Sequence, residues 1–309
     1  MMSGDADHST GTRSGFVAIV GRPNVGKSTL LNAMLGEKVA ITADKPQTTR
    51  NRIRGILNEA GSSGGPDFQI IFLDTPGITK PRNKLGSYMA NSAITSISDV
   101  DAILFVTDDP GRIAGGDRFI LDMLLESDVP CLLVINKTDL MSPDDFKAAY
   151  EEWEKSGRFA GVYGTVASDG DGVAGLLAKI RELMPEGPQY FPAGIVTDMP
   201  ERFIAAEIIR EKLLNYLHEE VPHGIAVEIE DWDENVTPVG ISAVIYTEKK
   251  SHKGIIIGKA GHTLKGVGKA ARLEIESLLG LRVHLKLWVK VKENWREDDR
   301  MLGSLGYKD

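Results

Sequence analysis

Gly21-Arg22-Pro23-Asn24-Val25-Gly26-Lys27-Ser28 is the stretch that decides the fold of this 309-residue chain. It follows an apolar run, Phe16–Val20, and precedes an apolar helical pattern, Thr29–Leu35. A glycine-rich loop that ends in Gly-Lys-Ser between a strand and a helix is typical of the phosphate-binding P-loop. Backbone N–H groups would hold the phosphates, and Lys27 would place its charge on the β- and γ-phosphates. Ser28 is then expected to bind magnesium. The candidate nucleotide-binding residues here are Gly21, Arg22, Pro23, Asn24, Val25, Gly26, Lys27, Ser28 and Thr29.

Asn136-Lys137-Thr138-Asp139 indicates which base is bound. It ends another apolar run, Cys131–Ile135, which places it at the carboxyl end of a strand, where α/β sheets bind ligands. Asp139 can accept hydrogen bonds from N1–H and the exocyclic amine of guanine, and adenine has no such donor pair. Asn136 would lie near guanine N7 and O6, and the stem of Lys137 along the base. The sequence therefore predicts a guanine nucleotide.

Asp74-Thr75-Pro76-Gly77 stands between these two motifs and follows the apolar strand predicted at 69–73. Asp74 can hold magnesium through water, and the Gly77 N–H can face the γ-phosphate. In Pro46-Gln47-Thr48-Thr49-Arg50, one threonine hydroxyl would join the magnesium shell when the γ-phosphate is present. We favour Thr49, although the sequence leaves Thr48 open.

Ile78 stands where Ras-like enzymes carry the glutamine that orients the attacking water. Its side chain has no hydrogen-bonding group, so we expect slow intrinsic hydrolysis. Asn24 is a candidate to hold a potassium ion beside the phosphates, as an asparagine does in a related set of GTPases. The alternative is that Asn24 stabilises the loop by local side-chain bonding. The candidate catalytic residues are Lys27, Thr49, Gly77 and Asn24.

The composition predicts a cytoplasmic globular protein. Hydrophobic residues make up 42% of the chain, and no apolar run is long enough to span a bilayer. Met1–Ser14 resembles a disordered tail rather than a signal peptide, and the single cysteine, Cys131, suits a reducing compartment. The formal net charge of −8 is unevenly spread. Residues 245–309 contain 14 Lys and Arg against 8 Asp and Glu, so a basic carboxyl-terminal part follows an acidic one.

Three prolines in Met184–Pro192 mark a linker that runs to about Pro200. Before it, strands at 16–20, 52–58, 69–73, 101–107, 130–135 and 162–166 alternate with helical patterns, which predicts a mostly parallel α/β sheet with one antiparallel hairpin. After it, a helix at 201–219, strands at 225–231 and 239–247, a helix at 262–279 and a strand at 282–290 predict an α+β domain. We expect a tail at 1–14, a GTPase domain at 15–184, a linker at 185–200, and a second domain with a carboxyl-terminal tail at 201–309.

Gly258-Lys259-Ala260-Gly261 follows three isoleucines and opens the helical run His262–Leu279. Such a loop can clamp a nucleic-acid backbone, as in the KH fold, whose groove takes about four single-stranded nucleotides. The alternative is a basic α+β domain with a glycine-capped helix. The candidate RNA-binding residues are Ile257, Gly258, Lys259, Ala260 and Gly261 with the basic positions Lys265, Lys269 and Arg272.

These motifs together resemble the Era family of bacterial Ras-like GTPases, and the resemblance covers nearly all of 15–309. The residues that carry it are 21–29, 46–54, 74–77, 136–139, 202–213, 257–261 and 284–292. The resemblance implies a P-loop GTPase domain followed by a type II KH domain, with Mg²⁺ and GTP or GDP as ligands. It also implies a factor that assists assembly of the small (30S) ribosomal subunit and binds the 3′ end of its 16S rRNA. Peripheral association with the inner face of the cell membrane is implied as well, and a monomer is the default.

The guanine-binding loop departs from the family pattern. Val166-Ala167-Ser168 stands where the family usually has Ser-Ala-x. The Ala167 N–H could still reach guanine O6, but the serine hydroxyl that braces the loop is missing, so we expect weaker guanine affinity. With the absent glutamine, this departure leaves open an RNA-binding module with a degenerate GTPase domain. The basic face leaves a second rival hypothesis, a membrane or cell-cycle signalling GTPase in which that face meets anionic lipid instead of RNA.

Overall fold

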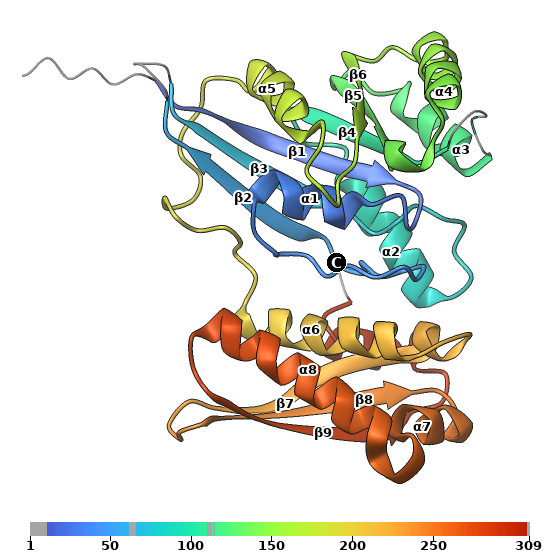
Figure 1. The fold of residues 1–309 in the computed structure, drawn as a ribbon, viewed down its shortest axis with the longest axis vertical. Coiled ribbons are helices and arrows are strands. Elements are labelled where there is room, and N and C mark those ends of the chain that lie inside the picture. The colour runs from blue at the N-terminus through green and yellow to red at the C-terminus, as the bar shows by residue number, and fades with distance from the viewer. Residues whose placement is uncertain (1–10, 62–65, 110–112, 114, 308–309) are drawn as a thin grey trace, which may run out of the picture.

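The computed structural model describes residues 11–61, 66–109, 113 and 115–307. Two sheets lie one above the other in Figure 1, and residues 184–200, which contain no helix or strand, pass between them. Most of the tail predicted at 1–14 and the middle of the hairpin tip predicted at 60–66 lie outside the described residues. No helix in the described ranges is long and apolar enough to cross a membrane.

The first sheet has six strands in the order β2-β3-β1-β4-β5-β6. All neighbours are parallel except β2 and β3, which form the predicted antiparallel hairpin. Apolar side chains fill both faces of the central strands, as helices on both sides of a parallel sheet require. The strands are β1 (Arg13–Gly21), β2 (Ile53–Glu59), β3 (Phe68–Asp74), β4 (Ala102–Thr107), β5 (Cys131–Asn136) and β6 (Gly161–Thr165).

Five helices cover this sheet. Leu30 of α1 and Leu176 of α5 pack in one core, whereas Ala93 of α2, Ile120 of α3 and Trp153 of α4 pack in the core on the opposite face. Because β1, β3 and β5 run parallel, their carboxyl ends point to one edge of the sheet, where the three predicted motifs begin. The helices are α1 (Lys27–Leu35), α2 (Lys84–Thr95), α3 (Gly115–Leu124), α4 (Pro143–Ser156) and α5 (Val173–Leu183).

The second sheet has the order β7-β8-β9, with β7 antiparallel and β9 parallel to β8. Helices α6 and α8 pack on one face of it, through side chains such as Ile209 and Ala271. The element order α6-β7-β8-α7-α8-β9 is that of the predicted type II KH fold. The elements are α6 (Glu201–Tyr216), β7 (Ile225–Asp233), β8 (Val239–Thr247), α7 (Lys250–Ile257), α8 (His262–Leu279) and β9 (Val283–Val291).

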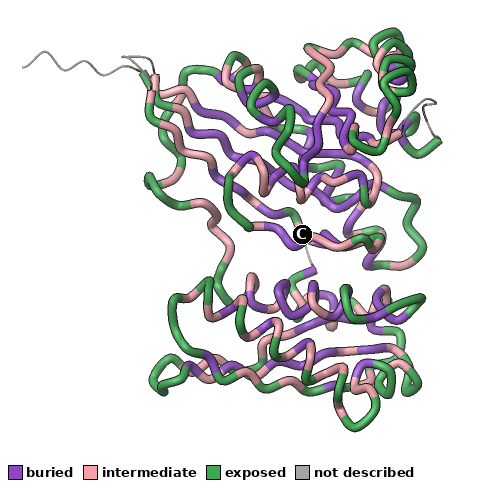
Figure 2. Tube along the Cα trace, in the orientation of Figure 1, coloured by how far each residue is buried: buried purple, intermediate pink, exposed green. Residues whose placement is uncertain are grey.

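Two parts of this region differ from the sequence prediction. Helix α7 was not predicted, because Gly254 and three consecutive isoleucines give it no helical periodicity. The segment predicted as a carboxyl-terminal tail is folded: a 3-10 turn (Trp295–Glu297) leads into α9 (Asp299–Ser304). Trp295, Leu302 and Tyr307 pack with Leu85 and Met89 of α2, so this segment joins the two halves of the molecule. Buried residues in Figure 2 accordingly fill both sheets and part of the boundary between them.

Candidate guanine-nucleotide site and RNA-binding loop

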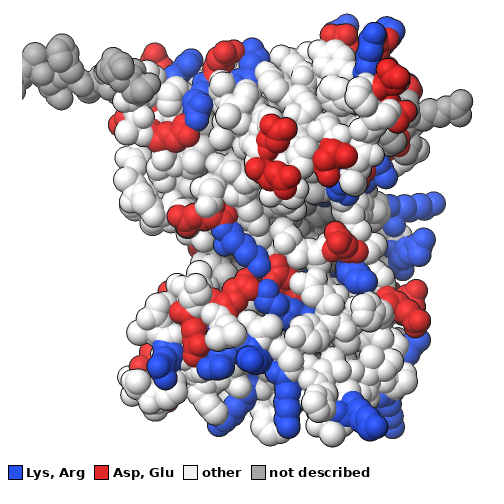
Figure 3. Space-filling view, viewed as in Figure 1, with Lys and Arg blue, Asp and Glu red and all other residues white. Residues whose placement is uncertain are grey.

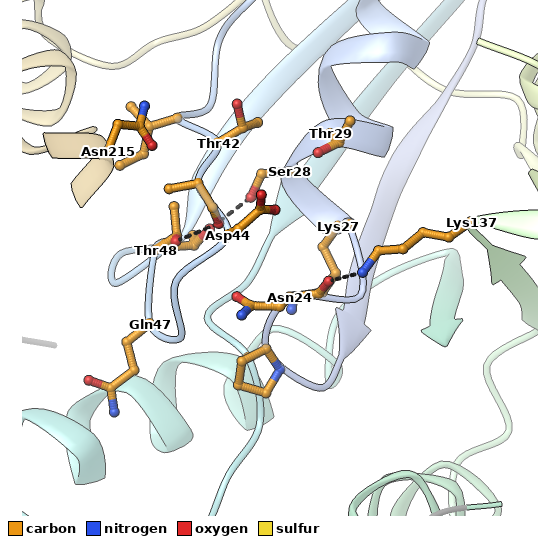
Figure 4. A pocket seen from close by; sticks show the side chains of 16 residues that line it. Asn24, Lys27, Ser28, Thr29, Thr42, Asp44, Gln47, Thr48, Lys137 and Asn215 are labelled. Atoms are coloured by element: carbon orange, nitrogen blue, oxygen red, sulfur yellow. Dashed lines mark hydrogen bonds between the residues drawn. The ribbon is translucent and has the colours of Figure 1, made fainter. Parts of the chain in front are cut away.

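A cavity of about 320 Å³ opens at the start of α1. The P-loop forms one side of it, and the segment 41–49 forms another. Gly77 and Lys137 add to its wall from the two later motifs. Figure 4 shows these side chains around one hollow, together with Asn215, which reaches in from α6. The P-loop and parts of the other two motifs, far apart in the sequence, therefore meet at one site.

The P-loop has the backbone shape that only glycine accommodates easily. Gly21 and Gly26 have φ angles of 155° and 97°. A Cβ at Gly21 would lie 2.3 Å from the Val106 carbonyl oxygen, and one at Gly26 would lie 2.2 Å from the Asn136 amide nitrogen. Asn24 also has a positive φ, 66°, which asparagine tolerates better than most residues. The loop can therefore turn its backbone N–H groups toward one point, as phosphate binding requires.

Lys27 is buried at the bottom of this loop. Its Nζ donates to the carbonyl oxygens of Gly21 and Arg22, at 3.3 and 2.9 Å. Burial lowers the pKa of Lys27 to about 8, although the nearby Asp74 opposes this. A phosphate group would satisfy this ammonium far better than two neutral carbonyls, because the bond would then join two opposite charges.

Ser28, Thr49 and Asp74 form a cluster of oxygen atoms. Ser28 Oγ lies 2.8 Å from Thr49 Oγ1 and 2.6 Å from Asp74 Oδ2, and Thr49 Oγ1 lies 3.4 Å from the same carboxylate oxygen. Asp74 Oδ1 is buried and has no hydrogen-bond partner in the described part of the chain. Burial raises the pKa of Asp74 to about 6. An orphaned carboxylate oxygen beside two hydroxyls suits magnesium, which prefers oxygen ligands.

Thr48 does not take part in this cluster. Its hydroxyl donates to the backbone carbonyls of Ala43 and Lys45, at 3.1 and 2.6 Å. Of the two threonines left open by the sequence, Thr49 is therefore the one placed to join a metal shell.

The Asp-x-x-Gly segment lies against the P-loop. A Cβ on Gly77 would come within 2.6 Å of the Pro23 nitrogen, so no larger residue fits there. The Thr75 hydroxyl donates to the Ile19 carbonyl, 2.8 Å away, and is fully buried, so it braces β1 instead of facing the cavity. Pro76 and Ile78 are buried as well, and Ile78 contributes no polar side-chain atom to the site.

Asn136 differs most from expectation. Its Nδ2 donates to the Val25 carbonyl at 2.9 Å, and its Oδ1 accepts from Thr165 Oγ1 and the Ala167 N–H at 3.0 and 3.1 Å. The Ala167 N–H predicted to reach guanine O6 thus already has a partner. Asn136 ties the P-loop to the loop after β6, which makes it a bracing residue in this structure.

Lys137 and Asp139 frame the base-binding side. Lys137 Nζ donates to the Asn24 carbonyl at 2.6 Å and pairs with Asp108 at 2.7 Å, so its ammonium group also braces the P-loop. Asp139 and Ser168 are exposed, and in the described residues the Asp139 carboxylate has no hydrogen bond. Asp139 is therefore free to accept from a ligand.

The motifs do not reveal the surroundings of Arg22, Val166 and Asn24. The Arg22 side chain turns to Asp117 of α3, with Nε 2.8 Å from Oδ2, although its backbone belongs to the P-loop. Val166 is buried, and its loop is closed by the backbone bond from Val166 N–H to the Asp171 carbonyl, 3.1 Å long. Asn24 is exposed and makes no side-chain hydrogen bond with the described residues, which leaves its local-bonding alternative without support.

Sequence reasoning missed the residues that line the cavity from the segment 41–44 and from α6. Thr42, Asp44 and Asn215 belong to no phosphate- or base-binding motif. Asn215 lies 188 positions after Lys27. No local pattern could have placed it here, because its position depends on how the two halves of the molecule pack.

The candidate RNA-binding loop lies between α7 and α8. Gly258 and Gly261 have φ angles of 72° and 78°, and a Cβ at Gly258 would lie 2.2 Å from Thr263 Oγ1. Lys259 and Ala260 between them are exposed. Ile257 is instead half-buried and packs against the second core, so its side chain supports the loop from beneath.

The basic residues after the loop lie on one face of α8, because they are four and three positions apart. Lys265 and Lys269 are exposed and form no ion pair among the described residues, whereas Arg272 pairs with Glu276 at 3.2 Å. Figure 3 shows Lys and Arg side chains gathered over the lower part of the molecule, where α8 runs. This face suits a polyanion.

Comparisons with known proteins agree with both halves of this description. The family model of the 50S ribosome-binding GTPases matches residues 16–137, and that of the KH domain matches residues 220–296. GTPase Era of Alkaliphilus oremlandii is 52% identical, and the match covers 96% of this chain and 99% of that protein. GTPase Era of Clostridioides difficile is 49% identical, and the match covers 96% of this chain and 99% of that protein.

Two solved structures superpose on nearly the whole chain. One is an Aquifex aeolicus Era variant bound to GDP and AlF4⁻, and the other is Era in complex with MgGDPNP and nucleotides 1506–1542 of 16S ribosomal RNA. Each has a TM-score of 0.90 and 38% sequence identity, covering 96% of this chain and 100% of the solved one. With a P-loop site in the first half, a KH fold in the second and relatives of this similarity over almost its full length, the chain belongs to the Era family of GTPases.

Proposed function

We propose that this GTPase is an assembly factor for the small ribosomal subunit and that its nucleotide state gates binding to the 3′ end of 16S rRNA. Family membership supports GTP hydrolysis, and the Era structure solved with 16S rRNA supports the choice of RNA. The observation that carries the gating is Thr49, which lies in the oxygen cluster with Ser28 and Asp74 while its neighbours contact the KH half.

The residues of the site divide the work of hydrolysis. Magnesium, when bound by Ser28, Thr49 and Asp74, would neutralise charge on the β- and γ-phosphates. Lys27 would stabilise the charge that develops in the transition state, and the Gly77 N–H would orient the γ-phosphate. Asp139 would select guanine, with Asn136 and Lys137 holding the P-loop beside it. Ile78 cannot orient the attacking water, so this step of hydrolysis lacks the help that a glutamine would give. We therefore expect slow turnover.

We further propose a division into a GTPase domain at 15–184, a linker at 185–200 and a KH domain at 201–309, which would clamp RNA with 258–261, Lys265 and Lys269. A cytoplasmic location and a monomeric state remain predictions from the sequence itself, and peripheral association with the inner face of the cell membrane remains a prediction of the family resemblance.

The deciding experiment measures binding of an oligonucleotide that matches the 16S rRNA 3′ end to protein loaded with GDP or with a GTP analogue. We expect micromolar or tighter guanine-nucleotide affinity and RNA affinity that differs between the two states. Linkage requires the RNA to change the ratio of the two nucleotide affinities by the same factor. RNA binding that ignores the nucleotide would contradict gating, and competition by anionic vesicles but not by other single strands would favour the lipid-binding alternative.

Asn24 adds a proposal about the monovalent cation. Its side chain is exposed at the cavity and unpaired in the described structure, so its amide oxygen is available to a potassium ion beside the phosphates. We expect GTP hydrolysis to be faster in potassium than in sodium at equal ionic strength, and Asn24→Ala to remove the difference. Equal rates in the two buffers would exclude this role.

A further inference from the structure

The segment 38–50, called switch I below, forms hydrogen bonds with the KH half on both sides of Thr49. The carbonyl oxygen of Thr48 accepts a hydrogen bond from Arg210 Nη2 of α6. Arg50, on the other side, extends its side chain into the carboxyl-terminal part of the chain. Thr49 itself points the opposite way, toward Ser28 and Asp74.

Arg50 is buried to an unusual degree for an arginine. Only 1% of it is exposed, and its Nη1 donates to the Ile225 carbonyl at 2.7 Å. The guanidinium lies 5.7 Å from the ring of Trp295 and 6.0 Å from that of Tyr307. It forms no ion pair with a carboxylate in the described residues, and burial lowers its pKa from the usual value. Burying a charge without a counterion is costly, so the position is held by its carbonyl and ring contacts.

Two consecutive residues of α6 hold switch I at two points: Arg210 at Thr48, next to Thr49, and Glu211 near the start of the segment. Arg210 is almost fully buried and is oriented by an ion pair with Glu207, one turn earlier on α6. Glu211 accepts from the Thr42 N–H at 2.9 Å and pairs with Lys38 at 2.7 Å. Two backbone contacts, at Thr48 and Thr42, and one side-chain contact, at Lys38, therefore fix switch I to α6.

From these contacts we infer that the KH half completes the nucleotide site. Arg50 and Arg210 act as positioning residues that hold Thr49 at the magnesium position, and Asn215 closes the cavity from α6. The inference rests on the proposed function, in which Thr49 binds magnesium only when the γ-phosphate is present. It adds that the energy for ordering switch I comes partly from the KH half, before any nucleotide binds.

The test replaces each anchor conservatively in the full chain, as Arg50→Lys and Arg210→Lys. Lysine keeps the charge but loses the planar fork that reaches two acceptors or stacks on a ring. We expect each variant to bind the GTP analogue about tenfold more weakly and to need about tenfold more Mg²⁺ for half-maximal single-turnover hydrolysis. Affinity for GDP should be unchanged, because Thr49 does not contact magnesium in that state.

Arg202→Lys is the matched control, since Arg202 lies on the same helix but donates to the Trp232 carbonyl and does not touch switch I. A general loss of stability would weaken GDP and the GTP analogue alike and would contradict positioning. If both variants kept the wild-type ratio of GTP-analogue affinity to GDP affinity and the wild-type Mg²⁺ dependence, the inference would be overturned and the proposed function would stand. Failure of the wild-type protein to hydrolyse GTP would instead overturn the proposed function.

Discussion

Lys27 is the residue at which electrostatics and function are most directly linked. Its lowered pKa, about 8, means that the free protein starts to lose this positive charge within the ordinary pH range. Bound phosphate needs the charged form, so a nucleotide that binds above pH 8 must also draw a proton from solvent. The site therefore couples binding to protonation.

We accordingly predict that affinity for GDP falls as pH rises through 8. Between pH 7 and pH 8.8 the loss should be about fivefold to tenfold, since one proton must be taken up for each nucleotide bound. Titration calorimetry in buffers of different ionisation enthalpy measures that uptake directly. Constant affinity with no proton uptake over this range would show that the ammonium stays charged in the free protein.

Asp139 is the residue that should set base choice. Its exposed carboxylate is not engaged within the described structure, unlike the side chain of Asn136. Replacing it by asparagine substitutes a donor for an acceptor opposite the exocyclic group of the base. Asp139→Asn should therefore shift the preference from GDP to XDP by at least tenfold. Competition between the two nucleotides measures the ratio, and retained GDP selectivity would refute the assignment of Asp139.

At the scale of elements, α8 and the loop before it form one basic unit. The glycine turn sets the start of the helix, and Lys265 and Lys269 then follow on its exposed face. Arg272 differs because Glu276 already pairs with it. The three residues should therefore contribute unequally to RNA binding.

The salt dependence of RNA binding tests this difference. For single strands, the slope of log affinity against log salt changes by about 0.7 for each phosphate neutralised. Lys265→Ala and Lys269→Ala should each reduce the slope by about that amount, and Arg272→Ala by less. Lys179→Ala on α5, a half-buried lysine that pairs with Glu182, serves as the control and should change nothing. Equal effects of all four variants would contradict the role of the α8 face.

The elements themselves were largely predictable. The buried strands of the first sheet are continuous apolar runs, and the motifs that follow β1, β3 and β5 indicate the direction of those three. Helix α7 was missed because Gly254 and three consecutive isoleucines give it no helical periodicity, which agrees with the burial of Ile256 alone among its residues. The role of Asn136 was missed for a different reason. Its partners Val25 and Thr165 lie 111 and 29 residues away, so the hydrogen bonds depend on the packed sheet.

At the scale of the whole molecule, the contacts of switch I could not be predicted at all. Arg50 and Ile225 are 175 positions apart, and neither carries a signal for the other. The sequence indicated two domains and a linker but gave no information about the surface on which they meet. That surface is where nucleotide binding and RNA binding can influence each other.

Hydrogen exchange would show this influence across the molecule. We predict that a GTP analogue with Mg²⁺, compared with GDP, slows amide exchange in α6 around Arg210 and near Ile225. The reason is that Thr49 would be fixed from both sides only in the triphosphate state. Amides of α5, whose buried side chains pack in the core of the first sheet, should exchange equally in the two states. Identical exchange throughout α6 would indicate that the two halves respond independently.

The folded carboxyl-terminal segment has a consequence for the newly made protein. A chain emerges from the ribosome amino terminus first, and its domains generally fold in that order. The P-loop sheet can therefore form while Trp295 and Tyr307 have yet to be translated. During that time Arg50 would lack the two aromatic rings that lie against it in the folded protein. A nascent chain would therefore bind a nucleotide before switch I can distinguish GTP from GDP, and that ability would appear only once Trp295 and Tyr307 are made.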